Sequence, residues 1–312
     1  MQTTMQMILD ALLPVILITA LGLGLARINL VTGEQWRGIE RLAYFILFPA
    51  IIVETVARAD FSEIPALGLG AALIGAILIV TVALLAVQPL LATRFKVSGP
   101  AFTSIYQGVA RWNSFIALAL IGEMIGATGL ALLAVAMIAM IPMLNVLSVL
   151  ILSRYAGGSA PTLKRIGLDL VRNPFIVSTL VGLALNLLGN PLPAPVMDSV
   201  HQIGLASLPI GILCVGASLD LSALRRPGAA LLIGTFARLL VMPALVAGLC
   251  HLLGVTGDAL LAGVIATAVP SASASYLLAA QMGGDHRLMA EILTVQTVVA
   301  ILTIPLCLAV LV

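Results

Sequence analysis

Long apolar runs follow one another along the whole chain, separated by short polar or charged segments. Each run is close to 20 residues or longer, which is the length that an α-helix needs to cross a bilayer. The ten expected membrane helices cover residues 8–27, 40–58, 64–91, 101–125, 128–153, 172–190, 199–219, 228–253, 258–283 and 288–312. The pattern therefore predicts an all-α integral membrane protein with ten transmembrane helices.

The fourth and ninth expected helices carry helix-breaking or charged residues at their centres. The interruptions read Ala110-Arg111-Trp112-Asn113-Ser114 and Val269-Pro270-Ser271-Ala272-Ser273. Pro270 has no amide hydrogen and its ring clashes with the carbonyl four residues back, so Ala266 is expected to keep an unpaired acceptor. Arg111 at mid-membrane costs about 3 kcal/mol or more unless it finds a partner or water. Irregular backbone at this depth is tolerated only inside protein or beside a water-filled cavity, so both interruptions indicate a site.

Composition agrees with this class of protein. The chain is 61% hydrophobic and 9% charged, with a mean hydropathy of +1.19, whereas soluble domains carry about 25% charged residues. A net charge of +2 and scattered basic residues argue against a nucleic-acid partner. Cys214, Cys250 and Cys307 have neither metal-site nor disulfide spacing, and we expect no cofactor and no metal. Residues 1–7 contain no lysine or arginine, so the first run is expected to be a retained helix and not a signal peptide.

The distribution of basic residues predicts the orientation. If the N-terminus lies outside, twelve of the fifteen lysines and arginines fall on the inward side and only Arg58 falls on the outward side. Cytoplasmic loops carry such an excess in membrane proteins. We therefore expect a bacterial inner-membrane protein with both termini outside and a cytoplasmic linker at residues 157–171.

The two halves of the chain, 1–156 and 172–312, contain a weak internal repeat. At an offset of 160 residues, Pro14, Ile16, Thr19, Gly22 and Leu23 align with Pro174, Ile176, Thr179, Gly182 and Leu183, and Pro49 aligns with Pro209. At an offset of 157, Asn113-Ser114 aligns with Pro270-Ser271 and Gly126 with Gly283. Five helices in each half reverse the orientation of the second copy. Inverted repeats with paired interrupted helices are typical of secondary transporters, in which the substrate binds near the midplane.

Several of these motifs together resemble the auxin efflux carrier family, which includes the plant PIN-formed auxin carriers and bacterial organic-acid carriers. The motifs are Arg111-Trp-Asn113-Ser, Arg172-Asn173-Pro174, the segment from Pro270 to Gly283-Gly-Asp285, and Thr303-Ile-Pro305. The resemblance implies ten helices in two inverted five-helix repeats, with crossed broken helices 4 and 9, similar to sodium–proton antiporters and bile acid symporters. It also implies a scaffold of helices 1, 2, 6 and 7, often dimeric, and a transport domain of helices 3–5 and 8–10. This chain lacks the long cytoplasmic loop of the plant carriers, so auxin itself is not implied.

The residue types at the two interruptions suit a small organic anion. Arginine holds a carboxylate through two parallel hydrogen bonds, although an ion pair of Arg111 with Glu123 or Glu54, or snorkelling, is an alternative. Serine and asparagine cap helix starts, and capping without substrate contact is the alternative interpretation for them. The candidate substrate-binding residues are Arg111, Asn113, Ser114, Pro270, Ser271, Ser273, Gln107 and Tyr276.

The coupling ion is left open by the sequence. Neither interruption contains a carboxylate, but sodium can bind to unwound carbonyls and hydroxyls alone, and a proton can bind to a buried carboxylate. The coupling candidates are Glu123, Asp285, Glu291 and Arg238, of which Arg238 either pairs with a carboxylate or neutralises charge beside the pathway. Transport driven by membrane potential alone, and a cation as the substrate, are the alternatives. The expected spans contain no catalytic triad, so an enzyme is not expected.

Overall fold

The computed structural model describes residues 2–59, 65–157, 162, 168, 172–225, 228–272 and 274–312, and all regular secondary structure in these ranges is helical. The first half contains α1 (Gln2–Arg27), α2 (Gly33–Leu42), η1 (Ala43–Leu47), α3 (Phe48–Arg58), α4 (Ala66–Arg94), α5 (Gly99–Ala110), α6 (Ser114–Ile125) and α7 (Ala127–Tyr155). The second half contains α9 (Pro174–Leu187), α10 (Ala194–Leu205), α11 (Ser207–Ala217), η2 (Leu221–Arg225), α12 (Ala229–Phe236), η3 (Ala237–Val241), α13 (Met242–Leu252), α14 (Gly257–Ala268), α15 (Ala274–Met282) and α16 (His286–Leu311).

Six helical segments of the described residues are long and apolar enough to cross a membrane. They are Asp10–Arg27, Ala66–Arg94, Ala127–Tyr155, Ala194–Ala217, Ala229–Leu252 and His286–Leu311. The other four expected spans are shorter, more charged or interrupted. The helix over 172–190 has only 14 residues, and the spans 101–125 and 258–283 each form two short helices.

The chain divides into two compact units, each built from segments of both halves. Unit 1 comprises Met1–Ala66, Phe115–Ile138 and Gly167–Ser218, and unit 2 comprises Leu67–Ser114, Ala139–Ile166 and Leu219–Val312. Chain neighbours are thus separated within single expected spans, since Ser114 belongs to unit 2 and Phe115 to unit 1.

Unit 1 is built on two helix pairs that pack backbone to backbone. α1 packs against α11, and α9 packs against α3. Gly22 lies directly on the carbonyl of Leu213, and a Cβ atom at Gly182 would lie 2.9 Å from the carbonyl oxygen of Val53. Small residues permit this close approach of membrane helices. At the offset of 160 residues, Gly22 corresponds to Gly182 and Val53 corresponds to Leu213. The contact of Gly22 with Leu213 therefore has its counterpart in the contact of Gly182 with Val53, with the roles of the two halves exchanged.

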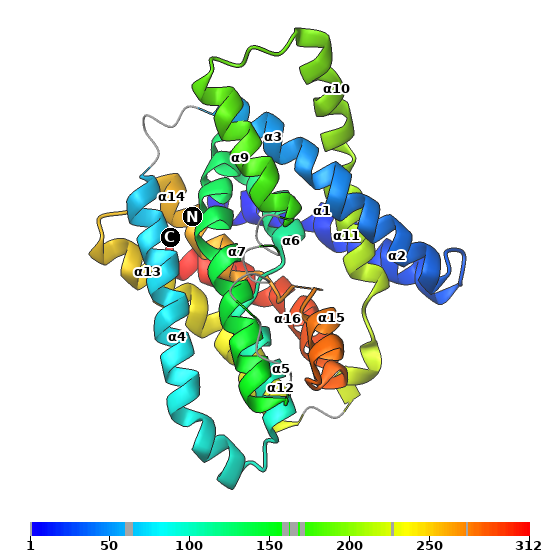
Figure 1. Ribbon diagram of the computed structural model, residues 1–312, viewed down its shortest axis with the longest axis vertical. Coiled ribbons are helices and arrows are strands. Elements are labelled where there is room, and N and C mark those ends of the chain that lie inside the picture. The colour runs from blue at the N-terminus through cyan, green and yellow to red at the C-terminus, as the bar shows by residue number, and fades with distance from the viewer. Residues whose placement is uncertain are drawn as a thin grey trace. The chain divides into compact units, whose positions relative to one another are not determined.

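Unit 2 is organised around α16, which contacts α5, α12, α14 and α15. Figure 1 shows α5 beside α12 and α15 beside α16. Met289 and Ile292 of α16 are fully buried in an apolar cluster with Leu231 and Ala279. Gly108 of α5 is held close to this cluster, because a Cβ atom there would lie 2.8 Å from Cγ2 of Ile292. Apolar packing therefore fixes α5 against α16 just before α5 ends.

Both interrupted spans leave the helix in the same way. The first break comprises residues 111–113, between α5 and α6, and the second break comprises the described residues 269–272, between α14 and α15. Arg111 has φ −78° and ψ 153°, and Val269 has φ −69° and ψ 155°, so both residues are extended. The short helices that follow end at Gly126 and Gly283, with φ of +73° and +78°, a left-handed conformation that favours glycine.

Two π-helical turns precede prolines. η1 is followed by Pro49 in α3, and η3 is followed by Pro243 in α13. Pro243 cannot donate a hydrogen bond to Leu239, and the thiol of Cys307 donates to that carbonyl instead, at 3.3 Å. Single π turns inside α-helices are frequent at functional sites. η3 carries Arg238, the largest fully buried side chain in the described residues.

Candidate functional site at the two helix breaks

The two breaks meet within unit 2. The amide of Asn113 donates to the carbonyl of Pro270 at 2.8 Å. In an unbroken helix this amide would pair with the carbonyl four residues back, so the contact replaces a helical bond with one between segments 157 residues apart. Trp112, Asn113 and Ser271 are all buried, with at most 4% of each residue exposed. The structure therefore brings together the two interruptions that the sequence singled out.

Arg238 donates hydrogen bonds to the backbone carbonyls that have no helical partner at the breaks. Its Nη2 donates to the carbonyl of Ala266 at 3.0 Å, which is the acceptor that Pro270 was expected to leave unpaired. Its Nε donates to the carbonyl of Val269 at 2.8 Å, and its Nη1 donates to the carbonyl of Val109 at 3.3 Å. Arg238 is fully buried. One guanidinium thus joins the C-terminal ends of α5 and α14.

Gln296 of α16 is a second connection between the breaks. Its Nε2 donates to the carbonyl of Gly108 at 2.9 Å and to the carbonyl of Gly234 at 3.1 Å. Its Oε1 accepts from the amide of Ser271 at 2.8 Å. Buried polar groups are almost always hydrogen-bonded, and this side chain uses its donors and its acceptor on three different segments. Gln296 therefore joins the last turn of α5 and α12 to the second break.

Other buried polar side chains around the breaks have no hydrogen-bond partner among the described residues. They include both amide atoms of Gln107 and the hydroxyls of Ser271 and Ser275. All three residues are 0% exposed. A buried donor or acceptor that has no hydrogen bond lowers the stability of the fold by about 1–3 kcal/mol. Gln107 and Ser271 were predicted as substrate-binding residues, and their open hydrogen-bonding capacity is what a ligand or water can use.

Arg111 stands beside this set and differs from Arg238 in being only half-buried. It lies at the end of α5, where its amide still donates to the carbonyl of Gln107 at 3.0 Å. Its Nη1 donates to Oδ1 of Asn145 on α7 at 3.1 Å. The positive charge of the first break is thus oriented by an amide side chain from another helix of unit 2.

Comparison with known proteins shows which protein family the chain belongs to. The model of a family described as membrane transport proteins matches residues 7–308. The chain belongs to this family. A protein of Methanothermobacter thermautotrophicus, described as an uncharacterized transporter, is 25% identical over 300 residues, which cover 95% of this chain and 96% of that protein. The family is the auxin efflux carrier-like one, so the resemblance stated from the sequence motifs is confirmed, and the protein is a multi-pass membrane transport protein.

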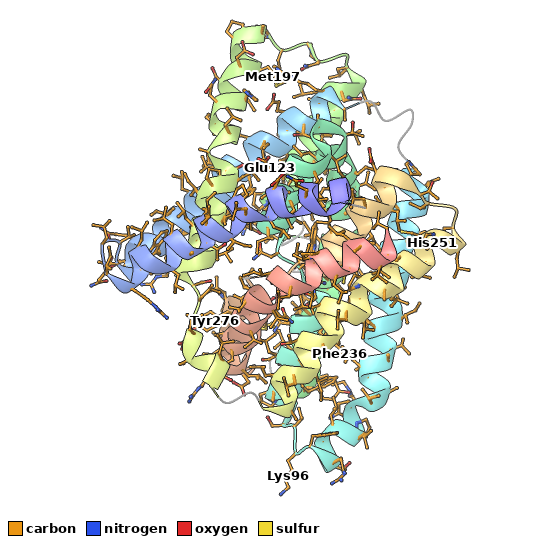
Figure 2. All side chains as sticks on the ribbon, turned by 180° about the vertical axis from the view of Figure 1, so that it is seen from behind. Lys96, Glu123, Met197, Phe236, His251 and Tyr276 are labelled. Atoms are coloured by element: carbon orange, nitrogen blue, oxygen red, sulfur yellow. The ribbon has the colours of Figure 1, made fainter. Side chains whose placement is uncertain are left out.

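The remaining predicted substrate-binding residues of this transport protein have varied positions. Pro270 is buried in the second break, and Ser114 is half-buried at the start of α6. Tyr276, labelled in Figure 2, is 39% exposed on α15, and its ring contacts His286 edge-on with 5.7 Å between centroids. Ser273 lies outside the described residues.

The three carboxylates proposed for coupling have local surroundings of their own. Asp285 caps α16, since its Oδ1 accepts from the amide of Leu288 at 3.0 Å. Glu291 forms an ion pair with Arg287 at 3.3 Å. Glu123, labelled in Figure 2, is exposed on α6 in unit 1. None of these contacts, within the described part of the chain, involves a residue of either break.

Unit 1 contains a separate polar cluster and an apolar cavity. Glu54, the alternative partner proposed for Arg111, contacts Arg58 at 3.1 Å and His201 at 2.9 Å. The cavity is lined by Ile51, Ile52, Thr55, Val56, Leu118, Leu130, Ala134 and Met137. Thr55 is the one polar residue among those that line it, and none of them is charged.

Sequence reasoning singled out Arg238 but left its partner open between a carboxylate and the pathway. The structure gives it three backbone carbonyls. Gln296 of α16 contacts Gly108 of α5 and Ser271 of the second break. The signal for both residues was the same, namely a strongly polar side chain near the middle of an apolar run.

Proposed function

We propose that the protein is a secondary transporter of a small organic anion, a mono- or dicarboxylate, that works by alternating access in the bacterial inner membrane. The observation that carries the proposal is the bond between Asn113 and Pro270. It joins two helix breaks that contain Arg111 and the unpartnered hydroxyl of Ser271, and Gln107 lies one turn before the first break in α5. Such convergence of interrupted helices is how transporters build a polar site within the membrane.

The proposed architecture is ten helices in two inverted repeats, 1–156 and 172–312, joined by the cytoplasmic linker 157–171, with both termini outside. Three observations support a two-fold relation between the halves. The contacts of Gly22 with Leu213 and of Gly182 with Val53 exchange under the offset of 160. The residues that cap α5 and α14 have nearly the same backbone angles, and the helices after both breaks end in left-handed glycines.

Division of labour between the units follows the same proposal. Helices of the first, second, sixth and seventh expected spans lie in unit 1, and both breaks lie in unit 2. We propose that these four helices form the scaffold, with a homodimer through them, and that unit 2 contains the moving substrate site. The glycine contacts of unit 1 suit a rigid scaffold, because interlocked backbones leave little freedom to slide.

At the site, the guanidinium of Arg111 binds the carboxylate through two parallel hydrogen bonds. The amide of Gln107 and the hydroxyl of Ser271 supply further polar contacts, which their lack of partners among the described residues leaves available. Export of a monoanion from a cell that is negative inside gains about 2.3 kcal/mol per 100 mV, so potential alone can drive the transport.

The test is uptake of labelled mono- and dicarboxylates into proteoliposomes by the wild-type protein and three variants. Arg111→Ala is expected to abolish uptake while the protein still folds, and Arg111→Lys to be strongly impaired because lysine cannot form the two parallel bonds. Arg94→Ala, at an exposed position at the end of α4, is the matched control and should transport normally. Unchanged uptake in Arg111→Ala would remove Arg111 from the site.

The second candidate is a cation-coupled antiporter or a sodium symporter. Carbonyls of unwound helices bind sodium in transporters, and here a cation would have to displace Arg238 from the carbonyls of Val109, Ala266 and Val269. A jump in sodium concentration or pH that produces a charge movement with no organic anion present would favour this candidate.

A further inference from the structure

Three carbonyls at the C-terminal ends of α5 and α14 point at one position in unit 2. They belong to Val109, Ala266 and Val269. A helix C-terminus carries about half a negative elementary charge, so two such ends make this position attractive to a cation. In transporters with discontinuous helices, the unwound carbonyls bind the coupling cation at this kind of position.

In this chain a positively charged side chain already occupies that position. The guanidinium of Arg238 lies 2.8–3.3 Å from the three carbonyl oxygens. Arg238 is 0% exposed, so neither bulk water nor lipid headgroups reach it. Every ion pair found in the described part of the chain involves other residues, and the partners of this guanidinium are neutral carbonyls. Its charge is thus balanced by helix ends and by no side-chain carboxylate that the structure describes.

The local backbone structure positions the side chain of Arg238 at these carbonyls. Arg238 is the second residue of the π-helical turn η3, which Pro243 follows. Each of its three nitrogen atoms makes one of the three bonds. A lysine has only one nitrogen at the end of its side chain and cannot reproduce the planar fork that contacts three separate carbonyls.

We propose that Arg238 is a tethered substitute for a coupling cation, so that the helix ends at the two breaks need no Na⁺ and have no room for one. The inference rests on the proposed transport function for its meaning, but the occupancy of the position is measured without any organic anion. It predicts that the transported anion moves without a monovalent cation bound between these carbonyls. Removing the guanidinium should recreate a site for a free cation.

The experiment measures the melting temperature of purified protein in detergent at constant ionic strength. The probes are the chlorides of choline, Na⁺, Li⁺, K⁺ and methylguanidinium at low millimolar concentration. The wild-type protein is expected to have the same melting temperature in all five salts. Arg238→Ala should melt at a lower temperature in choline and regain part of the loss, saturably, with methylguanidinium or a small cation. Arg287→Ala, whose side chain is 87% exposed, is the matched control and should show no cation dependence.

Arg238→Gln is measured in the same way, in case Arg238→Ala does not fold. Both variants are also expressed with and without methylguanidinium, and recovery of folded protein only with the added cation supports the proposal. A saturable stabilisation of the wild-type protein by Na⁺ would overturn it. Folded variants that respond to none of the cations, or variants that no cation recovers, would also overturn it. Because no organic anion is present, the result is independent of the Arg111 transport test.

Discussion

The two helix breaks share a backbone path but treat their polar groups in opposite ways. The first break contains its own charged residue, Arg111, which is half-buried and hydrogen-bonded to Asn145. The second break contains no charged residue among 269–272, and its open carbonyls are bonded by Arg238, 28 and 31 residues away. One arginine thus bonds three backbone carbonyls of the fold, whereas the other is the residue that we propose to bind the substrate.

The strongest way to test this difference is to remove each guanidinium in turn. Arg238→Met leaves three buried carbonyls without donors, at about 1–3 kcal/mol each, so it should cause the largest fall in the free energy of unfolding among these single substitutions. Arg111→Met should lose transport but change stability much less. Chemical unfolding of the purified variants in detergent micelles measures both. Equal loss of stability in the two variants would contradict the contrast.

A smaller loss of stability is expected from Gln296→Leu. The substitution leaves the carbonyls of Gly108 and Gly234 and the amide of Ser271 unpaired, at about 1–3 kcal/mol each, but the bonds that it removes come from a neutral amide and are weaker than those of a guanidinium. Gln202→Leu, at an exposed position of α10, is the control and should stay within about 0.5 kcal/mol of the wild-type protein. The same unfolding experiment applies, and a Gln296→Leu variant as stable as the control would show that the breaks hold their course without this side chain.

Gln107→Leu should separate function from stability. Both amide atoms of Gln107 are buried without partners in the described structure, so an apolar side chain of similar shape should leave the melting temperature unchanged or raise it. If the amide contacts the transported anion, the uptake rate at low substrate concentration should fall about tenfold, corresponding to about 1.4 kcal/mol. Normal uptake would place Gln107 outside the substrate site, and a lower melting temperature would indicate a structural partner.

The smallest effects are expected at the glycines that end the two short helices. Alanine in a left-handed conformation costs about 1–2 kcal/mol, so both Gly126→Ala and Gly283→Ala should be slightly destabilising. Gly283→Ala should lose more, because its Cβ atom would lie 3.1 Å from the carbonyl oxygen of Ala156, whereas a Cβ atom at Gly126 meets nothing within 4 Å among the described residues. Melting temperatures of the two variants compare the halves directly, and the reverse order would contradict the prediction.

Much of the architecture could be anticipated from local chemistry. Long apolar runs predicted a helical membrane protein, and six described helical segments have the length and composition to cross a membrane. Pro270 predicted an open acceptor at Ala266, because proline always lacks the amide hydrogen that a helix needs there. Motifs around both breaks predicted the family that comparison then confirmed. The ten-helix inverted repeat and its domain assignment stay predictions, which the exchanged glycine contacts of unit 1 support.

The sequence by itself predicted a membrane protein, the positions of both interruptions and the open carbonyl of Ala266, since these follow from neighbouring residues. Only the tertiary structure decided what satisfies the carbonyls at the breaks. The donors come from Arg238 and Gln296, up to 188 residues away in the chain, and a polar side chain in an apolar run shows that it needs a partner without showing which one. The choice depends on how α12, η3 and α16 pack around the breaks, because apolar packing sets which buried groups come within hydrogen-bonding distance.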